Sequence, residues 1–313
     1  MADLVVIAAD LDDEDVAAAE VAAAPYRVRV VGHVDDAAEE LGQARGIVGP
    51  VEPRHLAAAR ELEWVHSWIA GPDTQLHEAM RTSPVVLTSS AGNGGVPLAE
   101  HAIMMMLMLD RDAVRWVEAQ RDRRWDRHVH GELWGRTVAI IGLGNAGGDL
   151  ARKAKAFGMR TLGLRRRAGG VAGVDEIFTH DRLHEMLAQS DFVVVTTPRT
   201  PATLGMLGAA EFAAMPSHCF YVCISRGGVA DDDALLEALR SGGIAGAGLD
   251  AHSIEPLPPD SPFWDLPNVI VTPHNAATTP GTARRGVEIM LENLRRFARG
   301  LPLLNVVDKE QGY

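Results

Sequence analysis

Three polar side chains with complementary chemistry stand where predicted buried strands end in the second half of the chain. They are Arg226, Glu255 and His274. A guanidinium can bind a carboxylate, an imidazole can donate or accept a proton, and a carboxylate can orient the imidazole. In doubly wound sheets, ligands bind beyond the carboxyl ends of the strands, so this position favours one shared site. The alternative for each residue taken alone is a structural role: a strand-end Arg often forms an ion pair, and a strand-end His often hydrogen-bonds only to the backbone.

A glycine-rich turn gives the second chemical signal. The apolar run 138–141 leads into Gly-Leu-Gly-Asn-Ala-Gly and then into a helical pattern that continues to residue 157. A strand, G-x-G-x-x-G and a helix in this order indicate a dinucleotide site. The first glycine would allow the tight turn, the second would let backbone approach a pyrophosphate, and the third would let helix and strand pack closely. The candidate contacts are Gly142, Gly144, Asn145, Ala146 and Gly147, and a turn that binds nothing is the alternative.

The expected second strand after this turn ends in consecutive arginines. No Asp or Glu occurs from residue 150 to 174, where an acidic residue would otherwise bind a ribose 2′-hydroxyl. The basic residues in this window are Arg152, Lys153, Lys155, Arg160, Arg165, Arg166 and Arg167. On a chain of formal net charge −12 such a cluster favours a 2′-phosphate. The sequence therefore predicts NADP(H) in preference to NAD(H), with Arg165 and Arg166 as contacts, and a solvated basic loop is the alternative.

Alternating strands and helices must position these residues. In the first half we expect strands at 4–8, 27–31, 46–48, 63–69 and 85–88, and helices at 13–23, 36–43, 53–60 and 73–81. A helix at about 97–123 leads to strands at 138–141, 160–164, 192–196, 220–224, 245–249 and 269–272, with helices at 146–157, 182–189, 209–214, 231–240 and 282–299. This alternation predicts an α/β fold with two doubly wound parallel sheets.

Several motifs in a fixed order resemble those of the D-isomer-specific 2-hydroxyacid dehydrogenases. Besides the glycine turn they are Ile224-Ser-Arg-Gly-Gly-Val-Ala-Asp, Ala245-Gly-Ala-Gly-Leu-Asp with Glu255-Pro-Leu-Pro, Leu266-Pro-Asn-Val-Ile-Val-Thr-Pro-His, Leu98-Ala-Glu-His and Leu303-Leu-Asn-Val-Val-Asp. The resemblance covers nearly the whole chain. It implies a Rossmann dinucleotide-binding domain at 104–280 and a flavodoxin-like substrate domain at 1–103 and 281–313, with a cleft between them.

The resemblance also implies roles for individual residues. Arg226 would bind the carboxylate and carbonyl oxygen of a 2-keto acid, and His274 would protonate that oxygen as hydride reaches C2. Glu255 would hydrogen-bond the imidazole and favour its charged form. Further cofactor contacts are implied at Pro198, Ile224 and Asp250, the last of them near the nicotinamide. Loops that bind the substrate carboxylate are implied at Ala70, Gly71, Gly92, Asn93 and Gly94.

These features predict an NADPH-dependent reduction of a small 2-keto acid, such as glyoxylate or hydroxypyruvate, to the D-2-hydroxy acid. Trp68, beside the first implied substrate loop, favours larger or aromatic keto acids as an alternative. A nucleotide-sensing protein similar to the family's corepressors is a second alternative. The resemblance further implies a homodimer, for which the apolar helix from Pro97 and the tryptophans within 125–134 offer surface.

The chain departs from the family's usual pattern at three positions. Cys223 stands where Asn is common, so a hydrogen bond at the strand end is expected to be missing. His252 stands in a segment that is commonly Val-Phe, and we expect it to face solvent. Arg199 replaces an apolar residue and is expected either to contact phosphate or to lie on the rim of the site.

Composition sets the outer limits of the interpretation. Hydrophobic residues make up 47% and charged residues 23%, as in ordinary globular proteins. The acidic balance argues against nucleic acid and anionic membrane as partners, and the longest apolar stretch, 102–109, is too short to span a bilayer. Cys219 and Cys223 are expected to be buried thiols about 13 Å apart, too far for a disulfide. We expect a cytoplasmic protein without a metal site.

Overall fold

The computed structural model describes residues 3–166 and 169–312, so Arg167 of the basic cluster lies outside the described residues. The chain forms two compact units, which we call unit 1 (Met1–Gly94 and Thr279–Tyr313) and unit 2 (Gly95–Thr278). The expected division at 103/104 differs because helix α4 (Gly95–Asp110) packs as a whole on α6, β10 and β11 of unit 2.

Unit 1 contains a five-stranded parallel sheet with the order β2-β1-β3-β4-β5. The strands are β1 (Leu4–Ala8), β2 (Arg27–Val31), β3 (Ala44–Val48), β4 (Trp64–Ser67) and β5 (Val86–Ser89). All neighbouring pairs are parallel, and this order is that of flavodoxin-like sheets. The expected strands of the first half are therefore confirmed, with ends displaced by at most two residues.

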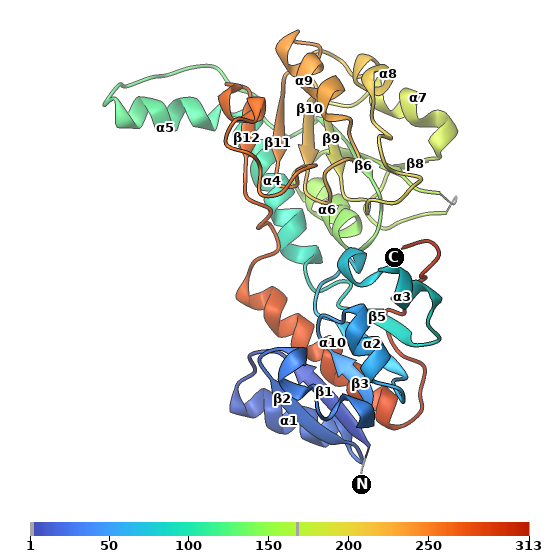
Figure 1. Ribbon diagram of the computed structural model, residues 1–313. Helices are drawn as coiled ribbons and strands as arrows, with labels where there is room; N and C mark the ends of the chain where they lie inside the picture. The colour runs from blue at the N-terminus through green and yellow to red at the C-terminus, as the bar shows by residue number, and fades with distance from the viewer. Residues whose placement is uncertain (1–2, 167–168, 313) are drawn as a thin grey trace. The chain divides into compact units, whose positions relative to one another are not determined.

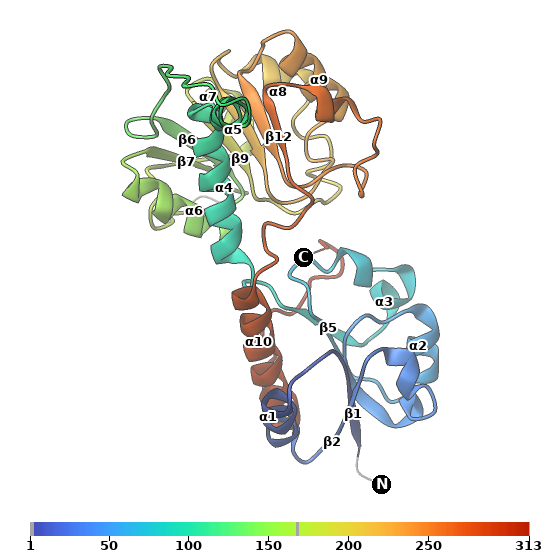
Figure 2. The same cartoon turned by 90° about the vertical axis from the view of Figure 1, so that its left-hand side faces the viewer.

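Helices cover both faces of this sheet. Helices α1 (Asp13–Ala23) and α10 (Pro280–Ala298) lie on one face, and the short α2 (Pro53–Ala58) and α3 (Glu78–Thr82) lie on the other (Figures 1 and 2). Side chains of β1 alternate between the two cores, because successive residues of a strand point to opposite faces. The C-terminal helix α10 thus completes the fold of the N-terminal segment.

Two expected helices of unit 1 are wrong in detail. Residues 36–43 form two 3-10 turns, Val34–Ala37 and Leu41–Gln43, rather than one helix. Gly42 lies within the second turn, and glycine inside a helix costs about 1 kcal/mol relative to alanine. Residues 73–81 likewise divide into the 3-10 turn Asp73–Gln75 and the helix α3.

A buried polar network joins the carboxyl ends of β4 and β5. The indole Nε1 of Trp64 donates to Thr88 Oγ1 at 2.8 Å, and the two ring nitrogens of His66 contact Thr88 Oγ1 at 2.8 Å and Ser90 Oγ at 3.2 Å. Burial lowers the pKa of His66 to about 4. The imidazole is therefore neutral at pH 7 and fixes the starts of the loops that follow both strands.

Unit 2 contains a seven-stranded parallel sheet with the order β12-β11-β10-β9-β6-β7-β8. The strands are β6 (Thr137–Ile141), β7 (Arg160–Leu164), β8 (Glu176–Phe178), β9 (Phe192–Val195), β10 (Phe220–Cys223), β11 (Gly246–Leu249) and β12 (Val269–Val271). From β8 to β11 the order is that of a Rossmann sheet. The expected strands are confirmed. The strand β8 was missed because Glu-Ile-Phe is short and begins with a charged residue, whereas the equally short β12 is an apolar run.

The faces of this sheet are also covered on both sides. Helices α4 and α6 (Asn145–Ala156) pack on one face, and α7 (Leu183–Leu187), α8 (Ala209–Ala213) and α9 (Asp232–Arg240) pack on the other. Figure 2 shows α8 and α9 on the side of the sheet opposite α4. The central strand β6 is buried on both sides, which explains its continuous apolar sequence. Cys219 and Cys223 are buried free thiols, as expected, and burial raises the pKa of Cys219 to about 12.

The expected single helix at 97–123 is wrong. It breaks at Asp112, whose φ of 52° is in the left-handed region, and continues as α5 (Ala113–Arg121), which projects from unit 2 as an arm (Figure 1). The chain turns here because α4 is apolar and packed, whereas α5 is polar and largely exposed. Among the described residues no helix has the length and apolarity needed to cross a membrane, and the cytoplasmic location stays a prediction.

The neutral state of His66 makes the stability of unit 1 depend on pH. An unfolded histidine takes up a proton near pH 6.5, whereas the folded His66 does so only near pH 4. Its contribution is therefore complete above pH 6.5 and is lost as the pH falls through 4, a change of about 3 kcal/mol. Urea unfolding of His66→Gln between these pH values should show a shallower acid destabilisation than the natural protein. The exposed His180→Gln should reproduce the natural slope, and equal slopes in all three proteins would contradict the prediction.

Candidate active site

The glycine turn between β6 and α6 has the geometry that its sequence predicts. Gly142 has a φ of 100°, and a Cβ there would lie 2.9 Å from the Thr197 nitrogen. A Cβ on Gly147 would lie 2.0 Å from the Gly142 carbonyl oxygen, so only glycine lets the helix approach the strand this closely. Around Gly144, by contrast, a Cβ would meet nothing within 4 Å. The expected tight turn and close packing are confirmed.

The first backbone N–H groups of α6 have no acceptor from an N-cap side chain. Gly144 is the N-cap residue and makes no side-chain hydrogen bond to the first turn. The first amides of a helix have no partner within that helix, and the helix dipole makes this end positive. The N–H groups of Asn145, Ala146 and Gly147 therefore suit an anion such as a pyrophosphate.

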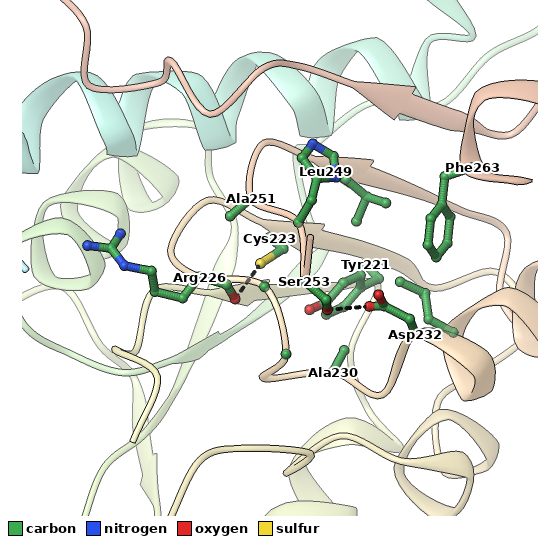
Figure 3. Close-up of a pocket in the computed structure, with 13 residues that line it drawn as sticks. Tyr221, Cys223, Arg226, Ala230, Asp232, Leu249, Ala251, Ser253 and Phe263 are labelled. Carbon is green, nitrogen blue, oxygen red and sulfur yellow. Dashed lines mark hydrogen bonds between the residues drawn. The ribbon is translucent and has the colours of Figure 1, made fainter. Parts of the chain in front are cut away.

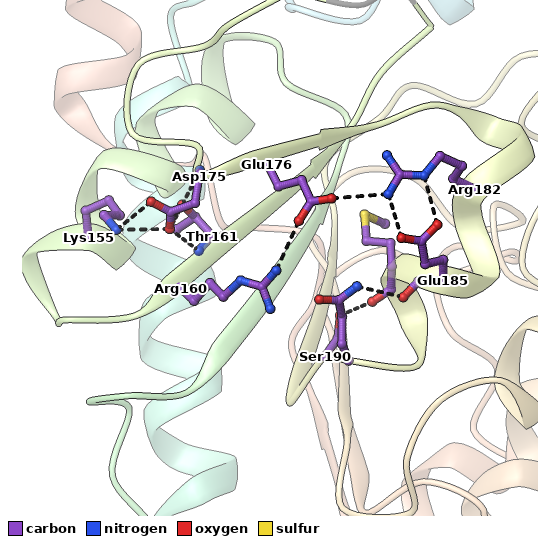
Figure 4. A network of polar contacts seen from close by, with 10 residues as sticks. Lys155, Arg160, Thr161, Asp175, Glu176, Arg182, Glu185 and Ser190 are labelled. Carbon is purple, nitrogen blue, oxygen red and sulfur yellow. Dashed lines mark hydrogen bonds and ion pairs between the residues drawn. The ribbon is translucent and has the colours of Figure 1, made fainter.

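Most of the basic cluster after this turn is engaged with carboxylates, which sequence inspection missed because the acids lie just outside the window. Lys155 binds Asp175 at 2.9 Å, and Arg160 binds Glu176 at 3.0 Å, in the network of Figure 4. On α6, Asp149 pairs with Arg152 at 2.8 Å and with Lys153. These four basic residues therefore contribute to the structure of the unit, not to a free positive surface.

The two arginines directly after β7, Arg165 and Arg166, are the expected phosphate contacts. Nη1 of Arg165 lies 3.5 Å from the carbonyl oxygen of Gly169, and Arg165 and Arg166 follow the carboxyl end of the strand next to β6. This is the strand end at which a Rossmann sheet selects between the two nicotinamide dinucleotides. The expectation of NADP(H) therefore depends on these two residues and not on the whole cluster.

Two other expected cofactor contacts, Pro198 and Ile224, lie at the ends of β9 and β10, and Arg199 lies beside them. Pro198 is exposed, and its carbonyl oxygen accepts a 2.7 Å hydrogen bond from Thr203 Oγ1. Ile224 is buried and its N–H donates to the Val195 carbonyl. Arg199 is exposed, and its Cδ would lie 3.5 Å from a Cβ on Gly228, so it sits beside the loop that carries Arg226.

The predicted catalytic residues follow three neighbouring strands. Arg226 comes after β10, Glu255 after β11 and His274 after β12, and these strands pair side by side. A Cβ on Gly227 would lie 2.0 Å from the His252 carbonyl carbon, so the loops after β10 and β11 are in backbone contact. The structure therefore brings the Arg226 and Glu255 loops together at one edge of the sheet, as parallel strands predict.

Cys223 fixes the loop of Arg226 from inside. Its thiol donates to the Arg226 carbonyl oxygen at 3.4 Å, and Arg226 Nη1 donates to the Ser225 carbonyl at 2.8 Å. The expectation that a strand-end hydrogen bond is missing at Cys223 is therefore wrong. A thiol is a weak donor, but here it reaches a backbone acceptor in place of an amide.

Glu255 and His274 form the central pair of the site. Nδ1 of His274 lies 2.8 and 2.9 Å from the two carboxylate oxygens of Glu255, which leaves Nε2 directed elsewhere. Burial tends to raise the pKa of Glu255, but hydrogen bonds from the His252 N–H at 2.8 Å and from His274 outweigh it, and the pKa is lowered. The carboxylate therefore stays ionised near neutral pH and can accept a hydrogen bond from Nδ1–H of His274.

Asp250 anchors the turn that carries His274. Its fully buried carboxylate accepts hydrogen bonds from Thr272 Oγ1 at 2.6 Å and from the N–H groups of Asn275 and Ala276 at 3.1 Å each. These bonds hold His274 at a φ of 50°, a left-handed conformation that is uncommon for non-glycine residues. Asp250 was expected beside the nicotinamide, and the contacts described here are with the protein.

Two histidines that the sequence left without a role complete this anchor. Nε2 of His252 contacts the Thr272 carbonyl at 3.0 Å, so the expectation that His252 faces solvent is wrong. Nε2 of His101, on α4, lies 3.1 Å from Thr272 Oγ1 and 3.7 Å from Asp250. Because the threonine proton goes to Asp250, His101 donates to the hydroxyl oxygen. The motif Leu98-Ala-Glu-His contained His101, but its partner lies far away in sequence.

The expected substrate loops lie together within unit 1. The N–H of Ser90 donates to the Ser67 and Ile69 carbonyls, and Gly92 has a φ of 99° in the turn after β5. Asn93 is buried, and its Nδ2 lies 3.5 Å from the Trp68 carbonyl. Ala70 is exposed and Gly71 partly so, which leaves backbone of the first loop accessible.

A small cavity beside Arg226 is not a substrate site. It lies between β10, β11 and the loop after β11, with a volume of about 20 Å³ that suits a single water molecule. Figure 3 shows the Arg226 side chain pointing away from this cavity, while Ser253 donates to Asp232 at its rim at 2.8 Å. The Arg226 guanidinium therefore does not point into this cavity.

Comparison with known proteins assigns the chain to a family. Residues 103–276 match the D-isomer specific 2-hydroxyacid dehydrogenase NAD binding domain. The chain is 34% identical to a glyoxylate reductase of Korarchaeum cryptofilum over 84% of its own length and 81% of that protein. It belongs to the D-isomer specific 2-hydroxyacid dehydrogenase family, whose curated relatives are named as oxidoreductases.

Other relatives show how far the likeness extends. A D-3-phosphoglycerate dehydrogenase of Archaeoglobus fulgidus is 33% identical over 82% of this chain, which spans about half (49%) of that longer protein. A solved Xanthobacter autotrophicus family member in complex with NADPH and MES is 31% identical, with a TM-score of 0.87 over 100% of both chains. An NADPH-dependent glyoxylate/hydroxypyruvate reductase of Sinorhizobium meliloti, with NADP and sulfate, is 31% identical and has a TM-score of 0.85 over 99% of this chain and 100% of that chain.

The open space around Gly144 gives a sharp test of the nucleotide turn. Gly144→Ala meets no protein atom within 4 Å, and its φ of −77° suits alanine, so the variant should keep its stability. The added methyl would stand where a pyrophosphate approaches, so we expect NADPH affinity to fall about tenfold or more. Titration of NADPH by fluorescence measures this loss.

The matched control is Gly148→Ala, one helical turn further along, where a Cβ also meets nothing within 4 Å. It should retain both stability and NADPH affinity. If Gly144→Ala binds NADPH as tightly as this control does, no dinucleotide approaches that turn.

Proposed function

We propose that the protein reduces a small 2-keto acid, of the glyoxylate or hydroxypyruvate kind, to the D-2-hydroxy acid with NADPH. The observation that carries this proposal is the Glu255–His274 pair at the edge of a Rossmann sheet, next in order to the loop of Arg226. Relatives named glyoxylate reductase and glyoxylate/hydroxypyruvate reductase support the substrate class. Structural neighbours in complex with NADPH or NADP support the cofactor.

The residues of the site have separable tasks in this reaction. Arg226 binds the carboxylate and carbonyl oxygen of the keto acid and fixes its orientation. The backbone of the loops 70–71 and 92–94 provides further donors for the carboxylate. The bound NADPH supplies the hydride to C2. His274 transfers the proton from its Nε2 to the carbonyl oxygen, so that keto acid, hydride and proton sum to the hydroxy acid.

We propose the remaining cofactor contacts around the glycine turn and the neighbouring strand ends. The amides of Asn145, Ala146 and Gly147 bind the pyrophosphate. Pro198 and Ile224 lie at the neighbouring strand ends and line the path of the dinucleotide. Asp250 acts on the nicotinamide side through the turn that it anchors.

A steady-state assay of NADPH oxidation tests the proposal. Glyoxylate, hydroxypyruvate and phenylpyruvate should be compared with both cofactors, and we expect turnover of the two small acids with NADPH. Turnover of phenylpyruvate alone would favour a reductase for aromatic acids. Binding of NADPH without turnover of any keto acid would instead favour a nucleotide sensor similar to the corepressors.

The carboxylate of Glu255 should set the acid limit of the reduction. Because hydrogen bonds hold the pKa of Glu255 below its usual value, the carboxylate stays ionised until the pH falls through that lowered pKa. Below it the carboxyl group takes up a proton and no longer acts as an anionic acceptor for Nδ1 of His274, so kcat/KM for reduction should fall at acid pH. Glu255→Gln has no carboxyl group to titrate, so its kcat/KM should be about tenfold lower near neutral pH and should lack this acid limb. Profiles of kcat/KM against pH for both proteins measure the difference, and identical profiles would contradict the role of Glu255.

Arg165 should account for much of the preference for NADPH. Arg165→Gln removes a guanidinium that can bind a 2′-phosphate, so the KM for NADPH should rise about tenfold while that for NADH stays within about twofold. Arg160→Gln is the control, because Arg160 lies at the other end of β7 and pairs with Glu176 of β8 at 3.0 Å. Equal effects of the two substitutions on NADPH would remove Arg165 from cofactor selection.

We further propose that the segment 113–134, which comprises α5 and the residues after it, forms a homodimer contact. The exposed apolar side chains of this segment include Trp116, Val117, Trp125, Val129 and Trp134, with Trp125 93% and Val129 100% exposed. Exposed aromatic surface of this kind is typical of subunit interfaces. Sedimentation should give a dimer mass that falls to the monomer mass in the double variant Trp125→Glu/Val129→Glu. The exposed Trp264→Glu should leave the mass unchanged, and a natural protein that sediments as a monomer would contradict the proposal.

A further inference from the structure

One arginine of helix α10 is fixed on a loop that the proposed function assigns to the substrate. Arg285 lies in the second turn of α10, and its Nε donates to the Asn93 carbonyl oxygen at 2.6 Å. The side chain is only partly exposed. Both residues belong to unit 1, so this contact is internal to that unit. The bond uses Nε and leaves the two terminal nitrogens to meet another group.

The other arginines of α10 are paired, and Arg285 is not. Arg284 binds Asp15 at 2.8 Å and Glu288 at 3.6 Å, while Arg295 and Arg296 bind Glu292 at 3.4 and 2.8 Å. Within residues 3–166 and 169–312 no carboxylate lies within ion-pair distance of the Arg285 guanidinium. A half-buried cation without a counter-ion is costly, so its presence at a loop points to an anion that arrives from outside.

The surroundings of Arg285 fix the direction of its guanidinium. Nη1 and Nη2 lie 3.2 and 3.7 Å from where a Cβ on Gly281 would stand, so the group lies over the first turn of α10, where the helix dipole is positive. On the other side, a Cβ on Gly286 would lie 3.7 Å from Asn93 Nδ2 and 4.0 Å from the Trp68 ring. Helix and loop thus approach each other closely around an uncompensated positive charge.

We propose that the guanidinium of Arg285, which the 92–94 loop holds through the Asn93 carbonyl, binds a second carboxylate, so that the enzyme favours 2-keto diacids over 2-keto monoacids. This inference rests on the proposed function, in which Arg226 already matches the charge of the 2-carboxylate. A monoanionic keto acid needs no second guanidinium, whereas the distal carboxylate of a diacid suits the planar, bidentate donors of arginine.

The experiment compares two keto acids of equal chain length that differ in the distal charge. Oxaloacetate carries the second carboxylate and 2-ketobutyrate carries a methyl group in its place. We expect a kcat/KM with NADPH that is at least about tenfold higher for oxaloacetate, because a hydrogen bond between charged groups contributes that much. Arg285→Gln should remove this preference and change the value for 2-ketobutyrate by less than about threefold, whereas Arg285→Lys should retain part of it.

Arg284→Gln is the matched control, since it removes the neighbouring guanidinium from its pairs with Asp15 and Glu288. It should leave the ratio of the two kcat/KM values unchanged. Thermal melting and NADPH affinity of each variant report on folding independently of the keto acid.

The possible failures are distinguishable. If Arg285→Gln lowers reduction of both acids equally, Arg285 only supports the 92–94 loop, and the subsite is overturned while the reductase function stands. A natural protein that prefers 2-ketobutyrate overturns the subsite in the same way. If the natural protein reduces no keto acid although it binds NADPH, the proposed function fails, and the subsite with it.

Discussion

The buried carboxylate of Asp250 is the interaction on which the site depends. A charge that is fully withdrawn from water is stable only if hydrogen bonds replace its hydration. Thr272 Oγ1, two backbone N–H groups of the following turn and the nearby ring of His101 meet that need. Burial holds the pKa of His101 below its usual value, against the pull of Asp250, so this ring acts mainly as a hydrogen-bond donor. The hydrogen bonds that stabilise the buried carboxylate therefore also fix the backbone of the turn that carries His274.

The other parts of the site follow from this anchor by short steps. The turn holds the imidazole of His274 in reach of Glu255, and the N–H of His252 fixes the same carboxylate from behind. Gly227 lets the loop of Arg226 lie directly against the segment of His252. Three strands that are distant in sequence thus present a guanidinium, a carboxylate and an imidazole at one edge of a sheet. Positioning here comes from backbone contacts and not from side-chain packing alone.

The sequence predicted what depends on periodicity and on local turns. Buried parallel strands have apolar sequences, so nearly all strands could be predicted. The geometry of the glycine turn could be predicted because it depends on steric contacts between residues close in sequence. The positions of Arg226, Glu255 and His274 at strand ends could be inferred, but the Glu255–His274 contact itself needed the fold. Short or mixed segments gave weaker signals, as the edge strand Glu176–Phe178 and the break at Asp112 show.

Several failures share one physical cause, which is that partners far apart in sequence cannot be paired from the sequence. Lys155 and Arg160 have their counter-ions, Asp175 and Glu176, at the start of the next strand. His252 was expected in solvent because its acceptor, the Thr272 carbonyl, belongs to another strand end. His101 and Arg285 gained their significance in the same way. Residues of this kind carry no local pattern, although they determine how the recognisable residues are held.

Single-turnover reduction by His274→Gln tests the central claim most directly. The variant would be saturated with NADPH and mixed with glyoxylate in a stopped-flow instrument, and the decay of the reduced nicotinamide would be compared with that of the natural protein. If the anchored imidazole gives the proton, the hydride-transfer rate should fall by a factor of about 10² to 10⁴ while NADPH affinity is preserved. A rate equal to that of the natural protein would contradict the account, because the proton would then come from elsewhere.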